Sequence, residues 1–269
     1  MRGYRSNQAL LAILAVVALF TVCDAEQRAV PSVKGEARLF QADGGASMPY
    51  RFFAPANLED GRKYPLVLCF HGAKGRGTDN QARGSLAYPV LTSEKMQRKY
   101  PAFVVAPQCP AGGKRWVNHN WSDGAYDSKK VAISDEMTLA LSIVDHLIAG
   151  LPVDKDRIYV TGRSMGGFAT WDAIARRPGF FAAAVPIAGG GDPQMAGEWK
   201  DLPIWAIASA GDRTCPASGT RMVVDALEKA GGKITYTEDP DKGHGEICMA
   251  WQEQKGLADW LFSQQKGKK

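Results

Sequence analysis

A serine flanked by glycines is the residue in this sequence that is best placed to do chemistry. It occurs in Gly162-Arg163-Ser164-Met165-Gly166, directly after the apolar residues 158–160 and before a helix-compatible run. Glycines lack the Cβ atoms that would collide where a strand turns sharply into a helix, so the motif predicts an exposed nucleophilic hydroxyl on Ser164. A helix that starts there directs free backbone N–H groups toward the negative charge that develops in acyl transfer. The alternative, a tight glycine turn with a bystander serine, is disfavoured because a strand and a helix flank the motif.

A histidine must accept the serine proton, and a carboxylate must orient that histidine. Nucleophile elbows of this kind use the chain order serine, acid, histidine. His244 lies after the last predicted strand and before the last predicted helix, so it is the predicted base. His119 precedes the elbow, and His71 is better explained as part of the loop that helps to bind the oxyanion.

Several aspartates compete for the acid position. Asp212 follows the penultimate predicted strand and is the predicted acid. Asp192 also follows a strand and is its main rival, whereas Asp239 and Asp241 share the loop of His244. Each of these residues could instead serve only to form a turn, because aspartate beside glycine or proline is common in turns.

The oxyanion of a tetrahedral intermediate needs two N–H donors. The Met165 N–H is predicted as one donor, and the loop after residues 65–70 should supply the second from Ala73, with Lys74 as the next choice. That loop is rich in glycine, but no Gly-Lys-Ser/Thr follows, which argues against phosphate binding. This chemistry needs no metal or organic cofactor, and the cysteine spacings do not suggest a zinc site.

Apolar and helical patterns alternate along the chain. Strands are predicted at 36–42, 49–54, 65–70, 102–106, 181–188, 204–208 and 233–237, besides the elbow strand, and helices at 93–99, 134–149, 170–176, 220–230 and 249–264. The first two strands are predicted to be edge strands joined by a hairpin turn. This alternation predicts a mainly parallel sheet with helices on both faces. Only residues 189–202 separate two late strands, which leaves little room for a cap domain.

Tryptophans are candidates for a substrate cleft. Trp116 and Trp121 lie in the loop at 107–127, which leaves the carboxyl end of a strand, where ligands bind in open α/β sheets. With Trp199 they are predicted to line the substrate site, the alternative being that they only cover the core.

The two ends of the chain carry separate signals. Residues 1–25 resemble a secretion signal, with Arg2 and Arg5 before the apolar residues 9–22. Cleavage after Ala25 is favoured over lipidation of Cys23, because a bulky valine precedes that cysteine. We therefore expect a secreted or periplasmic protein without membrane contact after cleavage. The formal net charge of +5 owes three units to lysines at the end of the chain, so no nucleic-acid partner is expected.

Four cysteines follow the predicted signal, and an exported protein can oxidise them. Cys215 lies shortly after Asp212 and Cys248 shortly after His244, so a working triad would bring them together. A Cys215–Cys248 bridge is predicted, ahead of one between Cys69 and Cys109. The alternative is that Cys215 and Cys248 are only small buried apolar residues, which is common for cysteine.

Several segments together resemble a known family. They include Phe70-His71-Gly72-Ala73, Ala106-Pro107-Gln108-Cys109-Pro110, the elbow, and Ala188-Gly189-Gly190-Gly191-Asp192. These segments resemble exported α/β-hydrolases often labelled predicted peptidases, which are related to polyhydroxybutyrate depolymerases and feruloyl esterases. The resemblance implies an α/β-hydrolase fold and the triad Ser164, Asp212 and His244. One departure is Ser209-Ala210-Gly211, where the family usually carries a His-Gly pair ahead of the acid.

The end signals and the extent of the resemblance together divide the chain. We expect a signal peptide at 1–25, an N-terminal extension at 26–38, an α/β-hydrolase domain at 39–262 and a basic tail at 263–269. The predicted activity is hydrolysis of small or polymer-linked carboxylic esters through an acyl-enzyme. A serine peptidase of the prolyl-oligopeptidase type and a non-catalytic binding module on the same fold are the alternatives.

Overall fold

The structure, a computed structural model, describes residues 34–81, 85–121 and 124–267. The predicted signal peptide, Cys23 and most of the predicted N-terminal extension lie outside the described residues. Among the described residues, no helix has the length and apolar character that crossing a membrane requires.

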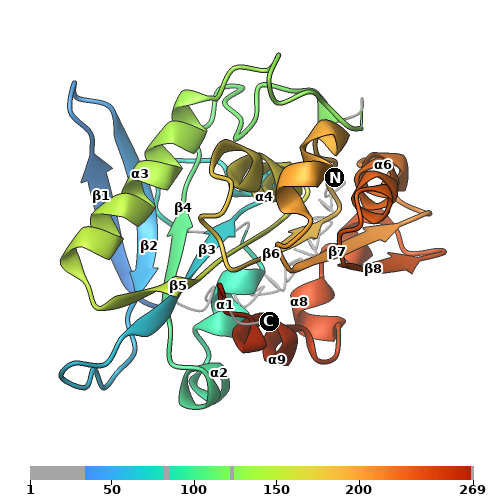
Figure 1. The fold of residues 1–269 in the computed structure, drawn as a ribbon. Helices are drawn as coiled ribbons and strands as arrows, with labels where there is room; N and C mark the ends of the chain where they lie inside the picture. Colours follow the sequence, from blue (N-terminus) through green and yellow to red (C-terminus); the bar gives the residue numbers. More distant parts are fainter. Residues whose placement is uncertain (1–33, 82–84, 122–123, 268–269) are drawn as a thin grey trace, which may run out of the picture. The chain divides into compact units, whose positions relative to one another are not determined.

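An eight-stranded sheet forms the centre of the fold, in the order β1-β2-β4-β3-β5-β6-β7-β8 (Figure 1). The strands are β1 (Glu36–Gln41), β2 (Ser47–Phe53), β3 (Tyr64–Phe70), β4 (Phe103–Pro107), β5 (Val153–Arg163), β6 (Ala183–Ile187), β7 (Ile204–Ser209) and β8 (Ile234–Asp239). β2 runs antiparallel to β1 and to β4, and all other neighbours are parallel. The predicted parallel sheet is confirmed. The prediction of two edge strands is wrong for β2, which lies between β1 and β4.

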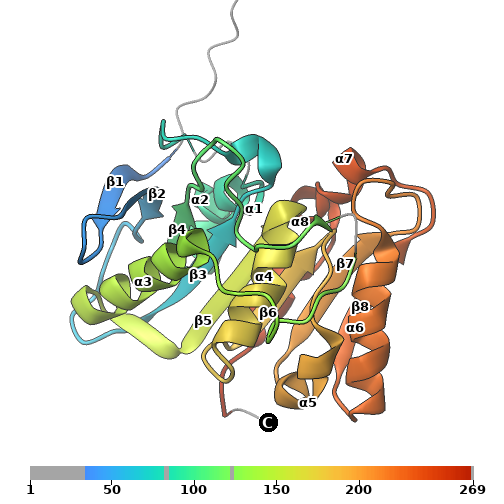
Figure 2. The same ribbon diagram turned by 90° about the horizontal axis from the view of Figure 1, so that it is seen from above.

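Helices cover both faces of this sheet. They are α1 (Ala87–Leu91), α2 (Glu94–Lys99), α3 (Asp135–Gly150), α4 (Met165–Arg176), α5 (Ala196–Trp199), α6 (Ala217–Lys229), α7 (His244–Ile247), α8 (Ala250–Glu253) and α9 (Leu257–Ser263). Figure 2 shows α3, α4 and α6 on one face, and α1, α8 and α9 pack on the other. Successive side chains of β3 alternate between the two cores, with Leu66 and Leu68 facing one and Val67 and Cys69 the other, as strand geometry requires.

The last predicted helix is wrong in its extent. The sequence pattern favours one helix over 249–264, but the structure has α8 and α9 with a break at Gly256, whose φ is 78°. A left-handed residue cannot continue a right-handed helix, and glycine adopts that conformation at little cost.

Only short elements connect β6 to β7. They are a 3-10 turn, Pro193–Met195, and α5. Within the described residues, this connection therefore holds no cap domain. The carboxyl ends of β5, β7 and β8 carry Ser164, Asp212 and His244, which brings the three predicted side chains to one edge of the sheet.

Candidate active site

The turn between β5 and α4 has the geometry of a nucleophile elbow. Ser164 has φ 55° and ψ −124°, a conformation that non-glycine residues rarely adopt. A Cβ on Gly162 would lie 2.3 Å from the Gly166 carbonyl oxygen, and a Cβ on Gly166 would lie 2.5 Å from that of Phe70. Both contacts are too short for any side chain. The glycines are therefore required by backbone packing, and they allow the chain to turn sharply at the serine.

The three predicted side chains lie in one hydrogen-bonded series. His244 Nε2 is 2.9 Å from Ser164 Oγ, and His244 Nδ1 is 2.7 Å from Asp212 Oδ2. The serine hydroxyl can donate to Nε2 if the imidazole carries its proton on Nδ1, where the carboxylate accepts it. This arrangement can remove a proton from the serine and stabilise the resulting imidazolium.

The Asp212 carboxylate is held from its other side by its own loop. Oδ1 accepts hydrogen bonds from the backbone N–H groups of Thr214 at 2.8 Å and Cys215 at 2.9 Å. The side chain is fully buried, so these N–H groups and His244 take the place of water around it. Oδ2 is thereby aimed at the imidazole.

A second contact joins the acid loop to the histidine loop. The Ser209 hydroxyl lies 2.6 Å from the Lys242 carbonyl oxygen and 3.0 Å from that of Asp239, and it accepts from the Gly211 N–H. The two backbones touch here, because a Cβ on Gly211 would lie 2.5 Å from the Asp241 carbonyl oxygen. In the sequence, Ser209-Ala210-Gly211 stands out only as a departure from the family pattern. That departure was the available signal for this contact.

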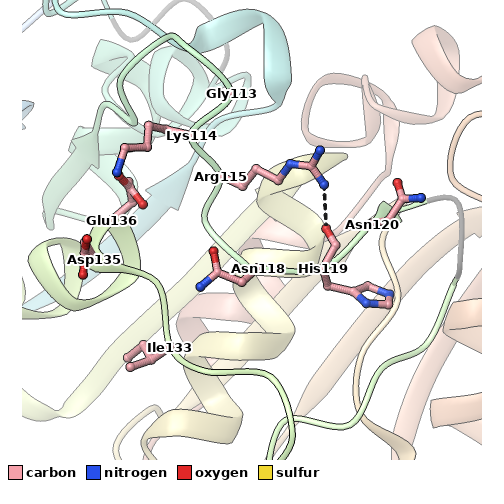
Figure 3. A pocket seen from close by; sticks show the side chains of 9 residues that line it. All are labelled: Gly113, Lys114, Arg115, Asn118, His119, Asn120, Ile133, Asp135 and Glu136. Carbon is pink, nitrogen blue, oxygen red and sulfur yellow. Dashed lines mark hydrogen bonds and ion pairs between the residues drawn. The ribbon is translucent and has the colours of Figure 1, made fainter.

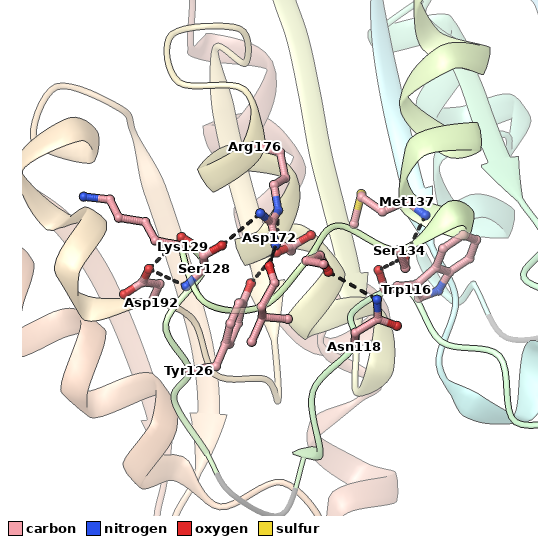
Figure 4. A network of polar contacts seen from close by, with 12 residues as sticks. Trp116, Asn118, Tyr126, Ser128, Lys129, Ser134, Met137, Asp172, Arg176 and Asp192 are labelled. Carbon is pink, nitrogen blue, oxygen red and sulfur yellow. Dashed lines mark hydrogen bonds and ion pairs between the residues drawn. The ribbon is translucent and has the colours of Figure 1, made fainter.

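Asp192, the rival acid, is fully occupied elsewhere. Its Oδ2 accepts from both the N–H and the hydroxyl of Ser128, at 2.7 and 2.6 Å, and its Oδ1 accepts from the Gln194 N–H. Figure 4 shows this pair beside the contacts of Asp172 with Tyr126 and Arg176. Asp192 therefore fastens the long loop that follows β4, and it does not contact His244.

His71 anchors the loop after β3. Its Nδ1 donates to the Gly72 carbonyl oxygen at 2.7 Å, and its Nε2 accepts from the Cys109 N–H at 2.9 Å. Burial lowers the pKa of His71 to about 4; the Gly72 hydrogen bond opposes this shift, and the nearby positive charges of Arg76 and Arg163 add to it. The imidazole is therefore neutral at physiological pH and supports the loop that carries Ala73.

The two predicted oxyanion donors occupy corresponding positions in adjacent segments. Met165 is the first residue of α4, and Ala73 is the first residue of a 3-10 turn, Ala73–Gly75. The N–H of a first helical residue has no acceptor within its own helix. The segments approach closely, since a Cβ on Gly72 would lie 3.4 Å from the Ser164 Cβ. The assignment of Met165 and Ala73, with Lys74 as the next choice, remains a prediction.

Two of the three predicted substrate-binding tryptophans lie in the core. Trp116 is fully buried, and its Nε1 donates to the His71 carbonyl oxygen at 3.1 Å. Trp199 is buried against Trp171, and its Nε1 donates to the Ile174 carbonyl oxygen. The prediction that these two residues line a substrate site is wrong, because an aromatic residue in a loop can pack inward. Trp121 is half-buried, and its role remains a prediction.

The predicted Cys215–Cys248 bridge is also wrong, because both residues are free buried thiols, as are Cys69 and Cys109. Each of the first pair contacts a member of the triad. Cys248 Sγ lies 3.9 Å from His244 Nε2, and the Ser164 side chain acts to lower the pKa of the nearby Cys215 thiol. Burial raises the pKa of Cys215 to about 12, with the Asp212 charge adding to the shift. This thiol therefore stays protonated at neutral pH.

The pKa of His244 is raised to about 9. Burial acts to lower it, but hydrogen bonds with Cys248 and with Asp212 favour the protonated imidazole and outweigh burial. The same contacts that position the base therefore also make it hold its proton to higher pH than a free histidine does.

Comparisons with known proteins agree with this architecture. Residues 103–206, from β4 to β7, match the prolyl oligopeptidase family. A poly(3-hydroxyalkanoate) depolymerase C of Paucimonas lemoignei is 31% identical over 127 residues, which is 47% of this chain and 28% of that protein.

Solved structures give the longest matches. A thermostable esterase superposes with a TM-score of 0.76 and 34% identity, over 86% of this chain and 63% of that one. The acylaminoacyl peptidase of Pyrococcus horikoshii, at 15% identity and a TM-score of 0.61, covers 87% of this chain and 42% of that one, and it supports the fold alone. The chain thus spans less than two thirds of each of these relatives. The sheet and the elbow give this chain the α/β-hydrolase fold, and these matches make it similar to a polyhydroxyalkanoate depolymerase and to an esterase.

Proposed function

We propose that this chain is a serine hydrolase that cleaves carboxylic esters through an acyl-enzyme intermediate. The observation that carries the proposal is the unbroken series from Ser164 through His244 to the buried carboxylate of Asp212, with the serine held at a positive φ. That combination places a hydroxyl, a base and an orienting acid at the opening of a helix, which is what acyl transfer requires.

In this mechanism, His244 Nε2 takes the proton of Ser164 as Oγ attacks the ester carbonyl carbon. The negative charge on the former carbonyl oxygen is stabilised by the N–H groups of Met165 and Ala73. His244 then gives its proton to the leaving alcohol, and the acyl-enzyme forms. Water, deprotonated by the same histidine, releases the acid and restores the serine.

An ester substrate is supported by the relatives. The esterase matches most of this chain, and the depolymerase is named for a polyester. The short connection between β6 and β7 supports an open site, which suits a small or polymer-linked ester. A smooth rise of rate through the solubility limit of a short-chain ester is expected for such a site, and a jump at that limit would contradict it.

A serine peptidase is the second candidate, favoured by the match of residues 103–206 to the prolyl oligopeptidase family. The same triad would serve, but the histidine would have to protonate a poor amine leaving group. A third outcome, a binding module without activity, is disfavoured by the complete triad geometry.

The test is hydrolysis of matched 4-nitrophenyl esters and peptide 4-nitroanilides by the wild-type protein and by Ser164→Ala. Ester turnover should fall on the order of a million-fold in the variant, the loss typical of removing a triad nucleophile. A serine-directed phosphonate should label the wild-type protein and leave Ser164→Ala unlabelled. Faster cleavage of the anilides would favour the peptidase, and ester turnover by Ser164→Ala near the wild-type rate would refute the assignment.

A further inference from the structure

Arg76 contacts Met165, the residue after the nucleophile, and its hydrogen-bonding capacity is largely unused among the described residues. It follows the 3-10 turn of the predicted oxyanion loop, and its Nη2 lies 3.3 Å from the sulfur of Met165, the residue after Ser164. A thioether is a weak acceptor. The Nε of Arg76 is buried and has no hydrogen-bond acceptor in the described part of the chain. A buried N–H of this kind normally has a partner, so its lack of one here is informative.

A second arginine lies close to the first. The guanidinium carbon of Arg115 is 4.9 Å from the ring centroid of Trp121, and that of Arg76 is 5.8 Å from the same ring. Arg115 spends one donor on the His119 carbonyl oxygen, at 3.2 Å. The guanidinium groups of Arg76 and Arg115 therefore both lie near the Trp121 ring.

Neither cation is neutralised by an acid among the residues that the structure describes. The neighbouring Lys114 is paired with Glu136 at 3.0 Å, whereas no ion pair within those residues involves Arg76 or Arg115. Arg115, but neither Arg76 nor Trp121, lines a pocket of about 400 Å³. In Figure 3 the Arg115 guanidinium points toward His119 and away from the Lys114–Glu136 pair. Two like charges near one ring repel each other, and an anion bound between them would remove that cost.

We propose that Arg76, Arg115 and Trp121 form a subsite that binds a carboxylate carried by the substrate. The preferred substrates are then carboxylic esters that bear a second, ionised carboxyl group, such as half-esters of dicarboxylic acids or esters of hydroxybenzoates. A planar guanidinium matches a carboxylate in a two-bond geometry that a lysine ammonium cannot reproduce. The contact with the Met165 sulfur places Arg76 against the first residue of α4, which follows Ser164 in the sequence. This inference rests on the proposed ester hydrolysis and names the substrate class for it.

Two pairs of esters test the subsite and show whether it recognises a carboxylate on the acyl part or on the alcohol part of the ester. For the acyl part, mono-4-nitrophenyl adipate is compared with its neutral methyl ester. For the alcohol part, 4-acetoxybenzoate is compared with methyl 4-acetoxybenzoate. The quantity measured is the ratio of kcat/KM for the charged ester to that for the neutral ester. In the wild-type protein this ratio should exceed one in at least one pair, and it should fall at about 1 M salt, where charges are screened within about 3 Å.

Substitutions then assign the preference to residues. Arg76→Gln should lower the ratio by about 10- to 100-fold, the range expected for losing a charge-assisted hydrogen bond, and Arg76→Lys should restore part of it. Arg115→Gln should lower it by a smaller factor. Arg98→Gln is the matched control, because Arg98 is exposed and paired with Glu94 within α2, and it should leave the ratio unchanged.

An independent measurement needs no variant. Adipate should inhibit hydrolysis of the neutral ester competitively, and adipamide, which has the same length without charge, should not. An equal ratio in wild type and in Arg76→Gln, or equal inhibition by adipate and adipamide, would overturn the subsite alone. Failure to cleave even the neutral esters would instead overturn the proposed hydrolysis and this subsite with it.

Discussion

The loops after β6 and β7 hold two aspartates in closely similar surroundings. Asp192 and Asp212 both follow neighbouring parallel strands, both are buried, and each accepts from the N–H two residues further on, at 2.9 and 2.8 Å. The loops differ in what meets the second carboxylate oxygen, which is Ser128 for Asp192 and His244 for Asp212. Burial and turn geometry thus hold the carboxylates of Asp192 and Asp212 in the same way. The partner alone decides whether it fastens a loop or orients a base.

The largest difference between the two loops should appear in turnover. Asp212→Asn should lower kcat by about 10,000-fold, because an amide no longer fixes the correct tautomer of His244. Asp192→Asn should cost far less, since its side chain does not touch the triad. Steady-state rates on a neutral 4-nitrophenyl ester measure both. A larger loss in Asp192→Asn than in Asp212→Asn would mean that the acid is misassigned.

Asp192 should contribute more to the stability of the fold than to turnover. Asp192→Ala leaves the N–H and hydroxyl of Ser128 without their acceptor in a buried place, which should cost about 1 to 3 kcal/mol per unsatisfied group. Chemical denaturation measures the free energy of unfolding. Asp241→Ala, at an exposed position, is the control and should change it little. A stability equal to wild type in Asp192→Ala would show that this contact does not fasten the loop.

The Ser209 contact extends the comparison, because the Asp192 loop has no equivalent link to the histidine loop in the contacts described above. Ser209→Ala should lower kcat by about 10-fold with KM little changed, as loss of a hydrogen bond of about 1 kcal/mol loosens the base relative to its acid. Ser142→Ala, on the exposed surface of α3, is the control. A change confined to stability, with kcat as in wild type, would limit Ser209 to a structural role.

The smallest expected effect is a shift in pH dependence. The base must be neutral to act, so the raised pKa of His244 predicts that kcat/KM rises with pH up to about 9. Cys248→Ala removes one contact that raises this pKa, and the rising limb should move to lower pH. Cys69→Ala is the matched control, since Cys69 is equally buried and lies in β3. If the rising part of the pH profile of kcat/KM moves equally in both variants, or in neither, then Cys248 has no specific effect on the pKa of His244.

Local sequence rules were sufficient for some features and not for others. The elbow and the order of Ser164, Asp212 and His244 follow from strand, turn and loop patterns, and the structure brings these side chains together. The inward packing of Trp116 and Trp199 could not be predicted, because which way a loop side chain points depends on distant backbone carbonyls. The free thiols of Cys215 and Cys248 also depend on side-chain direction, which proximity along the chain does not specify. The glycine-rich pattern of the loop after β3 indicates only phosphate or oxyanion binding, so it does not single out Arg76.

The close approach of Gly211 to Asp241 has a consequence for how such proteins can diversify. With 2.5 Å between a hypothetical Cβ and that carbonyl oxygen, the acid loop and the histidine loop cannot change size independently. Across relatives, residues 209–211 and 239–242 should therefore covary as one unit. A transplant of either loop alone into a related scaffold should fail where a transplant of both succeeds. The long loop after β4, which carries Arg115 and Trp121, is free of this constraint and can vary on its own.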